Sequence, residues 1–559
     1  MLQLSWNWDW GLSWAGDGSG TAADWGTAAL TAIAVVGGVY LLLYRMQTAR
    51  KHPDEPPIIA SAVPYVGHLL GMAMQGGRYV KGIGLRNRDK PIFTLPVPGS
   101  RIYIVTDPSL AAAVQRASKT LSFTPLVPDI ITRILGLDAD TVAIVRRHLD
   151  PEPGAPRGVL ADMHDMVYAY LGPGDALNDL SLAAARELAR QVNAFTAASS
   201  LPETVDLLVW VRHFVTLGTA AFLYGEQNPL AARPELGLED AFWDFDHGLG
   251  RLLMGVLPSL TARAPYRGRE ALAAALADYL ADVDLDTAVS PIIQKRVAIM
   301  RAHGMSPAAA ARCEVSFLFA GIVNTATTTF WVVLQIFARS ELLACVRAEL
   351  AGAVVDSEDG KRLQLDLDAV KTRCPTLLSV FRECLRVGSD NYSTRLVKTD
   401  TVLAGRHFLR AGSVVQVAGG VMHADPAIWG PDADDFDPER FVKLQGSSSS
   451  SSSASTTAGS GTDGGKPQQQ QQHHQVHPAA FRAFGGGKTL CPGRHFATNE
   501  ILAFVAMIVL GFDLDAADGG GEIAVPGKED GVLPVHILEP KTAVNVRILV
   551  RDGREIVVV

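Results

Sequence analysis

The chain has 559 residues, of which 48% are hydrophobic and 19% are charged, so it can bury a large core without disulfide bonds or repeats. That composition excludes a disordered chain and a small disulfide-stapled domain. The 50 basic and 58 acidic side chains give a formal net charge of −8, which lacks the basic excess that nucleic-acid binding requires, so no nucleic-acid partner is expected.

The N-terminal region contains an uncharged apolar run over residues 25–44. A helix of that length spans about 30 Å, the thickness of the hydrocarbon core of a bilayer. Residues 1–24 carry only acidic charges, whereas Arg45, Arg50 and Lys51 follow the run directly. This distribution differs from that of a cleaved signal peptide. By the positive-inside rule it predicts a lumenal N-terminus, a single transmembrane anchor at 25–44 and a cytoplasmic remainder.

The segment after the anchor, residues 45–66, is basic and rich in proline, so we expect a stiff connector there. Residues 67–559 are predicted to form one domain, mainly α with small β-sheets. It begins with a hairpin in which Ile92–Leu95 and Ile102–Val105 flank a Pro-Gly-Ser turn, and Asp107 caps the next helix. The other predicted elements are helices near 181–197, 266–283, 306–339, 339–352, 375–387 and 495–511, and strands near 413–418 and in the last twenty residues.

A second apolar stretch, Val315–Ala338, carries no formal charge and is long enough to cross a membrane. Its middle is polar, however, with Asn324 followed by several threonines, and Ser306 offers an N-cap for a helix that begins earlier. We therefore predict a helix from about Ser306 to Arg339 that runs through the core of a soluble domain.

Residues 446–476 differ in composition from the rest of the chain. They contain seven consecutive serines, then glycine and threonine, then five consecutive glutamines. Such a segment cannot bury apolar surface, so we predict a disordered low-complexity insertion at the surface.

The most informative stretch is Phe484-Gly-Gly-Gly-Lys-Thr-Leu-Cys491-Pro-Gly493-Arg, which an apolar helix follows. Its Gly-Gly-Gly-Lys-Thr portion suggests a phosphate-binding loop, but that motif needs a glycine where the chain has Arg482. The alternative is a thiolate at Cys491, at the mouth of a helix whose N-terminal amides favour an anion. This is what a thiolate ligand of iron requires. The remaining cysteines have no metal-binding spacing and are predicted to be free thiols that pack as small apolar residues: Cys313, Cys345, Cys374 and Cys384.

This stretch resembles the haem-binding loop of the cytochrome P-450 superfamily, and the resemblance covers about residues 50–559 apart from the insertion. It implies the cytochrome P-450 fold, with a long central helix over the haem. It also implies haem b (iron protoporphyrin IX) as the cofactor, with Cys491 as the iron ligand. The loop residues expected beside the haem are Phe484, Gly485, Gly487 and Gly493.

One departure from the family pattern concerns the haem propionates. The position two before the cysteine is usually Arg or His in the family and contacts a propionate, whereas this chain has Thr489. That contact is therefore expected to fall to Lys488 or another basic residue. Arg395 lies where family members often place an arginine on a propionate.

Further family marks follow in the expected order. Glu383-Cys-Leu-Arg386 matches the family's Glu-x-x-Arg, and the Pro-Glu-Arg-Phe segment downstream contributes Arg440. In the family these side chains form a buried triad that positions the cysteine loop, a structural role. The spacing alone is not diagnostic, because Glu187 and Arg190 have the same separation and are predicted to be an ordinary surface pair.

The predicted central helix then crosses the distal face of the haem. Ala320 and Gly321 resemble the small pair that lets substrate and dioxygen approach the iron. Most family members continue with an acid and a threonine that deliver protons, whereas this chain has Val323 and Asn324, with Thr325 next. Valine cannot relay a proton, although asparagine can hydrogen-bond an oxygen ligand. Asn324 and Thr325 are therefore the predicted catalytic residues. The pattern is similar to that of the branch containing sterol 7α-hydroxylases and prostacyclin synthase.

The resemblance implies a membrane-anchored haem-thiolate monooxygenase of the endoplasmic reticulum. It would hydroxylate a sterol-like or other lipophilic substrate with dioxygen, using electrons from NADPH through NADPH-cytochrome P-450 reductase. One alternative is a haem-thiolate isomerase or dehydratase that acts on a peroxide without a reductase, which the residues at 323 and 324 favour. A further alternative is a non-catalytic haem-binding or lipid-binding membrane protein.

Overall fold

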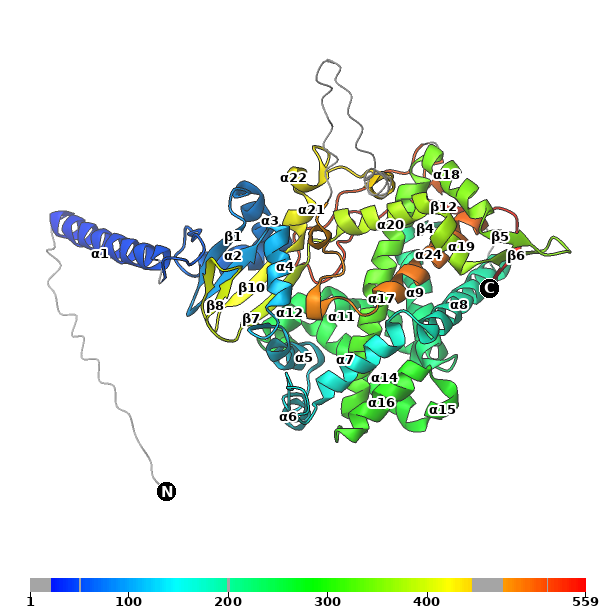
Figure 1. The fold of residues 1–559 in the computed structure, drawn as a ribbon, viewed down its shortest axis with the longest axis horizontal. Helices are drawn as coiled ribbons and strands as arrows, with labels where there is room; N and C mark the ends of the chain where they lie inside the picture. The colour runs from blue at the N-terminus through cyan, green and yellow to red at the C-terminus, as the bar shows by residue number, and fades with distance from the viewer. Residues whose placement is uncertain (1–21, 50–51, 199–201, 445–475, 520) are drawn as a thin grey trace, which may run out of the picture.

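The computed structural model describes residues 22–49, 52–198, 202–444, 476–519 and 521–559 (Figure 1). The predicted insertion at 446–476 lies outside the described residues except for Val476, as does most of the predicted lumenal stretch. The described part is mainly helical with small sheets, which confirms the predicted fold class.

The predicted anchor is part of helix α1 (Ala22–Thr48), which projects away from the rest of the molecule (Figure 1). It begins before the predicted run and extends past Arg45 into the segment expected to be connector. Among the described residues, four helices are long and apolar enough to span a bilayer: α1, α9 (Leu207–Tyr224), α17 (Pro307–Phe337) and α24 (Arg494–Gly511). The apolar window of α1 is entirely unburied, whereas those of the other three are mostly buried inside the fold.

Helix α17 is the central element of the domain. Ser306 caps it by accepting a hydrogen bond from the backbone N–H of Ala309 at 3.1 Å, and Pro307 occupies the first turn. The helix packs against α9, α14 (Arg263–Asp282), α20 (Pro375–Gly388) and α24. The structure therefore confirms that Val315–Ala338 belongs to the core of the domain.

The other predicted helices are present with shifted ends. The helix expected at 181–197 begins earlier, as α8 (Asp175–Ala198), and the one expected at 339–352 is α18 (Ser340–Ala351). Sequence reasoning missed α9, which is apolar along most of its length and so shows no amphipathic period, although Asp206 caps it through the N–H groups of Leu208 and Val209. The remaining helices are α2 (Gly67–Gln75), α3 (Gly77–Arg86), α4 (Pro108–Arg116), α5 (Val127–Leu135), α6 (Ala139–Val145), α7 (Val159–Leu171), α10 (Pro229–Ala232), α11 (Leu238–His247), α12 (Leu249–Met254), α13 (Pro258–Thr261), α15 (Leu285–Ala288), α16 (Pro291–Ala302), α19 (Leu367–Arg373), α21 (Gly419–His423) and α22 (Pro426–Trp429).

The largest sheet has the order β1-β2-β10-β7-β3. Its predicted hairpin is formed by β1 (Ile92–Val97) and β2 (Ser100–Val105), with Ile92 opposite Val105, and the side chain of Asp107 caps α4 as expected. The other strands of this sheet are β3 (Leu121–Ser122), β7 (Tyr392–Val397) and β10 (Val414–Ala418). The smaller sheets contain β4 (Glu203–Asp206), β11 (Phe512–Ala516) and β12 (Asn545–Val550); β5 (Val354–Asp356), β6 (Arg362–Leu365) and β13 (Glu555–Val558); and β8 (Thr401–Leu403) with β9 (His407–Leu409).

Candidate active site

The loop that carries Cys491 follows a short 3₁₀ helix at Pro478–Ala480 and leads directly into helix α24. Gly485 and Gly487 have φ values of +76° and +61°, the left-handed region that favours glycine. A Cβ at Gly485 would lie 2.9 Å from the carbonyl oxygen of Thr489, and one at Gly487 would lie 3.0 Å from Cβ of Gln115. The glycines are therefore needed for the loop to fold this tightly against α4.

Hydrogen bonds fix the position of Cys491 within the loop. Its backbone N–H donates to the carbonyl oxygen of Phe484 at 2.9 Å, which closes the loop into a hairpin-like turn. The hydroxyl of Tyr168, on α7, donates to the carbonyl oxygen of Leu490 at 2.6 Å. The guanidinium of Arg494 donates to the carbonyl oxygen of Cys491 at 3.0 Å. None of these three hydrogen bonds involves the thiol of Cys491.

Opposing effects act on the Cys491 thiol. Burial raises its pKa, while the backbone N–H groups of Gly493 and Arg494 and the charge of Arg494 act in the opposite direction. Burial is the largest of these effects, so the helix terminus by itself does not produce a thiolate at neutral pH. A metal cation at the sulfur supplies the positive charge that deprotonates a coordinating thiol.

An inner cavity of about 280 Å³ lies next to the thiol and is lined mostly by apolar side chains. Cys491, Phe484 and Gly493 line it from the loop, and Ala320 and Gly321 line it from α17. A Cβ at Gly493 would lie 3.9 Å from Sγ of Cys491, so this glycine keeps the space beside the sulfur open. The cavity offers one thiol, a glycine that leaves the space beside the sulfur open, and apolar walls. These features fit a haem that is ligated by a thiolate.

Asn324 and Thr325, the predicted catalytic residues, both line this cavity, but their hydrogen bonds differ. The Oδ1 atom of Asn324 accepts from the backbone N–H of Ile537 at 3.0 Å. Because a backbone N–H can only donate, this contact assigns Oδ1 and leaves Nδ2 as the donor available to the cavity. Val323 is fully buried in the core instead.

Sequence reasoning missed Glu500, a fully buried carboxyl on α24. Its Oε2 atom lies 3.5 Å from the hydroxyl of Thr325, and its Oε1 atom lies 3.4 Å from the hydroxyl of Thr219 on α9. Burial raises the pKa of Glu500 to about 8, so the side chain is protonated at neutral pH. A buried acid nine residues after the cysteine is visible in the sequence, but its contact with Thr325 depends on how α24 meets α17.

Glu500→Gln is expected to change the pH dependence of stability. The pKa of Glu500 in the folded protein, about 8, exceeds the usual value of 4.5. The neutral carboxyl therefore contributes fully to the free energy of unfolding below pH 4.5, and this contribution is lost as the pH rises to about 8. The loss amounts to about 1.4 kcal/mol per pH unit. The variant should therefore lose less thermal stability than the parent between pH 6 and pH 8, and the infrared band of a protonated carboxyl should disappear. Equal pH dependence in both proteins would contradict this assignment, and Glu187→Gln, in an ion pair whose arginine is 55% exposed, serves as the control.

Buried arginines rather than a lysine lie beside the cysteine loop. Arg395, on β7, donates to the carbonyl oxygen of Gly486 at 3.1 Å and to the hydroxyl of Thr489 at 2.6 Å. Arg482, which the sequence analysis did not assign to the site, is almost completely buried. Lys488, predicted as a propionate contact, is exposed to solvent instead.

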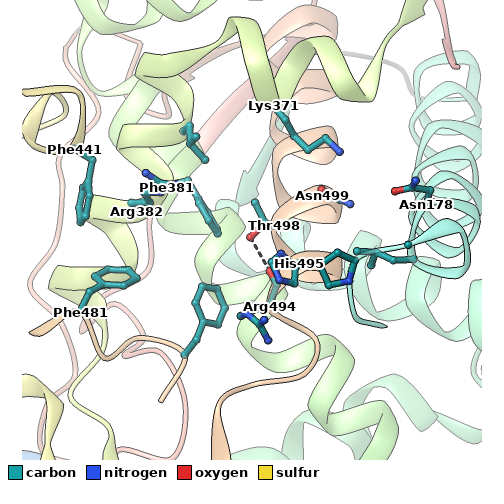
Figure 2. Close-up of a pocket in the computed structure, with 15 residues that line it drawn as sticks. Asn178, Lys371, Phe381, Arg382, Phe441, Phe481, Arg494, His495, Thr498 and Asn499 are labelled. Carbon is teal, nitrogen blue, oxygen red and sulfur yellow. Dashed lines mark hydrogen bonds between the residues drawn. The ribbon is translucent and has the colours of Figure 1, made fainter. Parts of the chain in front are cut away.

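An outer depression of about 770 Å³ lies on the other side of the loop, between α20 and α24 (Figure 2). Phe484 lines both this depression and the inner cavity, so it separates the two. Basic side chains around the depression are Lys371, Arg382, Arg494 and His495, and none of its described lining residues is acidic (Figure 2).

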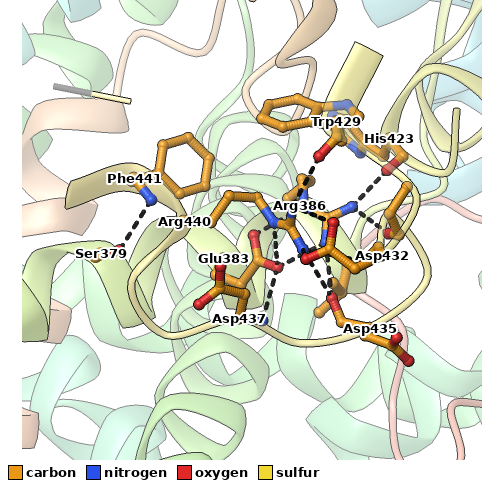
Figure 3. Close-up of polar contacts among 12 residues, drawn as sticks. Ser379, Glu383, Arg386, His423, Trp429, Asp432, Asp435, Asp437, Arg440 and Phe441 are labelled. Carbon is orange, nitrogen blue, oxygen red and sulfur yellow. Dashed lines mark hydrogen bonds and ion pairs between the residues drawn. The ribbon is translucent and has the colours of Figure 1, made fainter. Parts of the chain in front are cut away.

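The predicted triad forms as a buried cluster (Figure 3). Glu383 accepts from Arg386 in a bidentate pair, with Nη2 at 2.6 Å from Oε1 and Nε at 2.8 Å from Oε2. Arg440 adds its Nε at 3.0 Å from Oε1 of Glu383 and also pairs with Asp432. The side chain of Glu383 is completely inaccessible to solvent. Glu187 and Arg190, which have the same spacing as Glu383 and Arg386, also form an ion pair, at 2.7 Å. Its arginine is 55% exposed, as expected for a pair near the surface.

The triad is connected to the cysteine loop through His423. Arg386 donates to the carbonyl oxygen of His423 at 2.5 Å, and Nε2 of His423 accepts from the backbone N–H of Arg482 at 2.8 Å. Burial lowers the pKa of His423 to about 3, so its imidazole is neutral and Nδ1 donates to the carbonyl oxygen of Ser389. The cluster thus fixes the backbone just before the loop.

All five cysteines lie within the described residues, and none of them is in a disulfide bond. Cys374 and Cys384 are buried and Cys313 is partly buried, in keeping with small apolar packing residues. Cys345 is exposed, so the prediction of a core position was wrong for this residue. It lies on α18, whose buried face is formed by Leu342, Val346 and Leu350 and does not include Cys345.

Comparison with known proteins finds relatives over most of the chain. The sequence profile of the cytochrome P-450 family matches residues 286–537, a range that contains α17, the triad and the cysteine loop. A cytochrome P-450 monooxygenase of Hypoxylon pulicicidum called nodJ is 30% identical over 489 residues, covering 86% of this chain and 87% of that protein. The 5-beta-cholestane-3-alpha,7-alpha-diol 12-alpha-hydroxylase of Sus scrofa is 26% identical, with 87% and 91% covered. The cholesterol 7-alpha-monooxygenase of Cricetulus griseus is 23% identical, with 88% and 92% covered.

Proposed function

The chain belongs to the cytochrome P-450 family and is an oxidoreductase of the monooxygenase class, and from this premise we propose that it is a membrane-anchored haem-thiolate enzyme that hydroxylates a sterol-like or other lipophilic substrate. The observation that carries the proposal is the inner cavity, where Cys491 faces Ala320, Gly321 and Asn324 of α17. A thiolate-ligated haem, when bound, supplies the redox chemistry that activates dioxygen and oxidises an unreactive C–H bond.

The polar residues of the cavity have distinct tasks in this proposal. Asn324 is oriented by Ile537 so that its Nδ2 donates a hydrogen bond to an oxygen atom in the cavity. Thr325 connects the cavity to Glu500, which holds a proton on its carboxyl at neutral pH. Glu500 and Thr325 therefore replace the acid that Val323 cannot supply, and they hold a proton next to the cavity without exposing it to solvent.

The substrate class is supported by the cavity wall and by the relatives. Apolar side chains such as Leu171, Leu223, Phe222 and Ile537 form most of the lining, which favours an apolar ligand with few polar groups. One relative is named as a 12-alpha-hydroxylase of a cholestane diol, and another is named as a cholesterol 7-alpha-monooxygenase. A sterol or a similar fused-ring lipid is the proposed substrate.

NADPH-cytochrome P-450 reductase is the proposed electron donor. The outer depression carries the basic side chains of Lys371, Arg382, Arg494 and His495, and it lies across Phe484 from the inner cavity. A basic surface steers an acidic partner toward itself, and the attraction weakens with salt. Docking there would bring the donor close to the cysteine side of the haem.

Membrane attachment is supported by α1 and by a second apolar surface, which we call the peripheral apolar surface. It consists of exposed residues from α2, from α12 to α13 and from the loop at 532–535: Leu69, Leu70, Met74, Met254, Val256, Leu257, Leu260, Val532, Leu533 and Val535. The backbone N–H of Gly77 donates to the carbonyl oxygen of Val532, and a Cβ at Gly250 would lie 3.9 Å from Leu533, so these segments are neighbours. Clustered exposed apolar side chains mark a surface that contacts lipid or a partner. The proposed location is the endoplasmic reticulum membrane, with the domain in the cytoplasm.

The proposed function is tested with full-length protein in phospholipid vesicles supplied with dioxygen and a panel of sterols. We expect a hydroxylated product that forms only when both NADPH and the reductase are present. Turnover of a lipid hydroperoxide without NADPH or reductase, and no hydroxylation with them, would instead support the isomerase reaction. A substrate-induced spectral change with neither type of turnover would indicate a haem-binding protein without activity.

Deleting residues 1–44 is expected to convert a spanning protein into a peripheral one. The full-length protein should resist extraction from membranes by alkaline carbonate, because a transmembrane helix is not released by it. The deleted protein should still float with vesicles but be extracted by carbonate, and adding Leu257→Ser and Leu260→Ser should release it into solution. Val355→Ser, an exposed apolar residue on β5, is the matched control. A deleted protein that is soluble without further change would contradict the role of the peripheral apolar surface.

A further inference from the structure

Two buried arginines beside the cysteine loop differ from the other buried arginines of the described residues. The other six each pair with a carboxylate: Arg101 with Glu55, Arg212 with Glu539, Arg269 with Glu270, Arg296 with Glu314, and both Arg386 and Arg440 with Glu383. Within the described part of the chain, Arg395 and Arg482 have no carboxylate at ion-pair distance. Burying a positive charge without a counter-ion is costly, so this pair indicates that an anion completes the site.

The two guanidinium groups converge on Gly486. Arg395 donates from Nη2 to the carbonyl oxygen of Gly486 at 3.1 Å, and Nη1 of Arg482 lies 2.5 Å from the place where a Cβ of Gly486 would be. Ser393, two residues before Arg395 on the same face of β7, accepts from Nη2 of Arg482 at 2.7 Å. The Nε atom of Arg482 is buried without a hydrogen-bond partner.

The backbone of Arg482 is held on both sides. Its N–H donates to the neutral imidazole of His423, and its carbonyl oxygen accepts from Nδ2 of Asn391 at 3.0 Å. Burial and the nearby charge of Arg395 lower the pKa of Arg482 to about 10, which leaves it positively charged at neutral pH. Two rigidly placed cations that repel each other form a built site for a negative group.

We infer that Arg482, together with Arg395, binds the propionate carboxylates of the haem and replaces the basic residue that the cytochrome P-450 pattern places at position 489. The propionates lie along one edge of haem b, and guanidinium groups bind carboxylates through paired N–H donors. Thr489 takes a supporting part, because its hydroxyl accepts from Arg395 at 2.6 Å and so orients that guanidinium. The inference rests on the proposed haem-thiolate function, with Arg482 as a cofactor-binding residue.

The experiment compares full-length haem-loaded protein with Arg482→Gln, Arg482→Lys and Arg482→Gln/Thr489→Arg. Resonance Raman spectra report the propionate bending mode, and transfer to excess apomyoglobin reports the rate of haem loss. Arg482→Gln should shift the propionate mode and speed haem loss about tenfold, because a charge-assisted hydrogen bond is removed. The reduction potential should fall, since a positive charge near the haem is lost. Arg482→Lys should lose haem at a rate between those of the parent protein and Arg482→Gln. Adding Thr489→Arg to Arg482→Gln should restore slow haem loss.

The matched control is Arg190→Gln, which removes an exposed guanidinium that pairs with Glu187 and should change neither readout. An unchanged propionate mode together with unchanged haem loss in Arg482→Gln would overturn the inference. If that variant does not retain haem, the same two measurements on Arg482→Lys with and without Thr489→Arg decide the matter, and an unchanged mode again overturns it. Failure of the proposed function is recognised separately, because the unaltered protein would then lack a thiolate-type carbon monoxide spectrum.

Discussion

Replacing Cys491 by alanine is expected to abolish both the thiolate-type spectrum of the reduced carbon monoxide complex and all monooxygenase turnover. Cys491 is the only thiol among the described residues that line the inner cavity. Its loop is fixed by the backbone contact with Phe484 and by the hydroxyl of Tyr168, and in the variant no thiol remains among the described residues that line the cavity. Without this thiolate, a bound haem would lack the ligand that favours cleavage of dioxygen. The measurement is the difference spectrum of reduced protein with and without carbon monoxide, together with product formation.

The control for this prediction is Cys345→Ala, which removes an exposed thiol on α18 and should leave spectrum and turnover unchanged. A normal thiolate-type spectrum in Cys491→Ala would refute the ligand assignment. Protein that binds haem through a nitrogen ligand in both the parent and the variant would do the same.

Replacing Glu383 by glutamine is expected to prevent stable incorporation of haem. The carboxylate accepts hydrogen bonds from both Arg386 and Arg440, and all three side chains are buried. Removing the negative charge leaves Arg386 without a carboxylate partner and Arg440 with only Asp432, and breaking a buried ion pair in this way costs about 3–5 kcal/mol. Arg386 also contacts the carbonyl oxygen of His423, next to the cysteine loop in the hydrogen-bond network. The measurement is the ratio of bound haem to protein in purified material.

Glu187→Gln is a matched control, because Glu187 and Arg190 have the same spacing on a helix as Glu383 and Arg386. Its arginine is 55% exposed, so the loss should be only about 0–1 kcal/mol and haem content should not change. A soluble, fully haem-loaded Glu383→Gln variant would contradict the positioning role of the triad. Equal losses in both variants would show that burial of the pair does not matter.

Local patterns predicted the elements whose residues repeat or cap in a recognisable way. The hairpin around residues 92–105, the cap at Asp107 and the helix beginning after Ser306 follow from side chains within a few residues of each other. The apolar helix α9 was missed because it is buried on nearly all sides and so lacks an amphipathic period. The exposed position of Cys345 was also missed, since a lone cysteine carries no information about which face of a helix it occupies.

The sequence by itself determined the family, the cysteine at 491, the Glu383 and Arg386 pair and the apolar run near the N-terminus, because each depends on residue identity and short spacing. Only the tertiary structure decided that Glu500 meets Thr325, that Ile537 orients Asn324 and that Arg482 lies beside Arg395 without a carboxylate. These contacts join segments that are from 87 to 213 residues apart in the chain. Their existence depends on how helices and strands pack around one core, which no local pattern of side chains specifies.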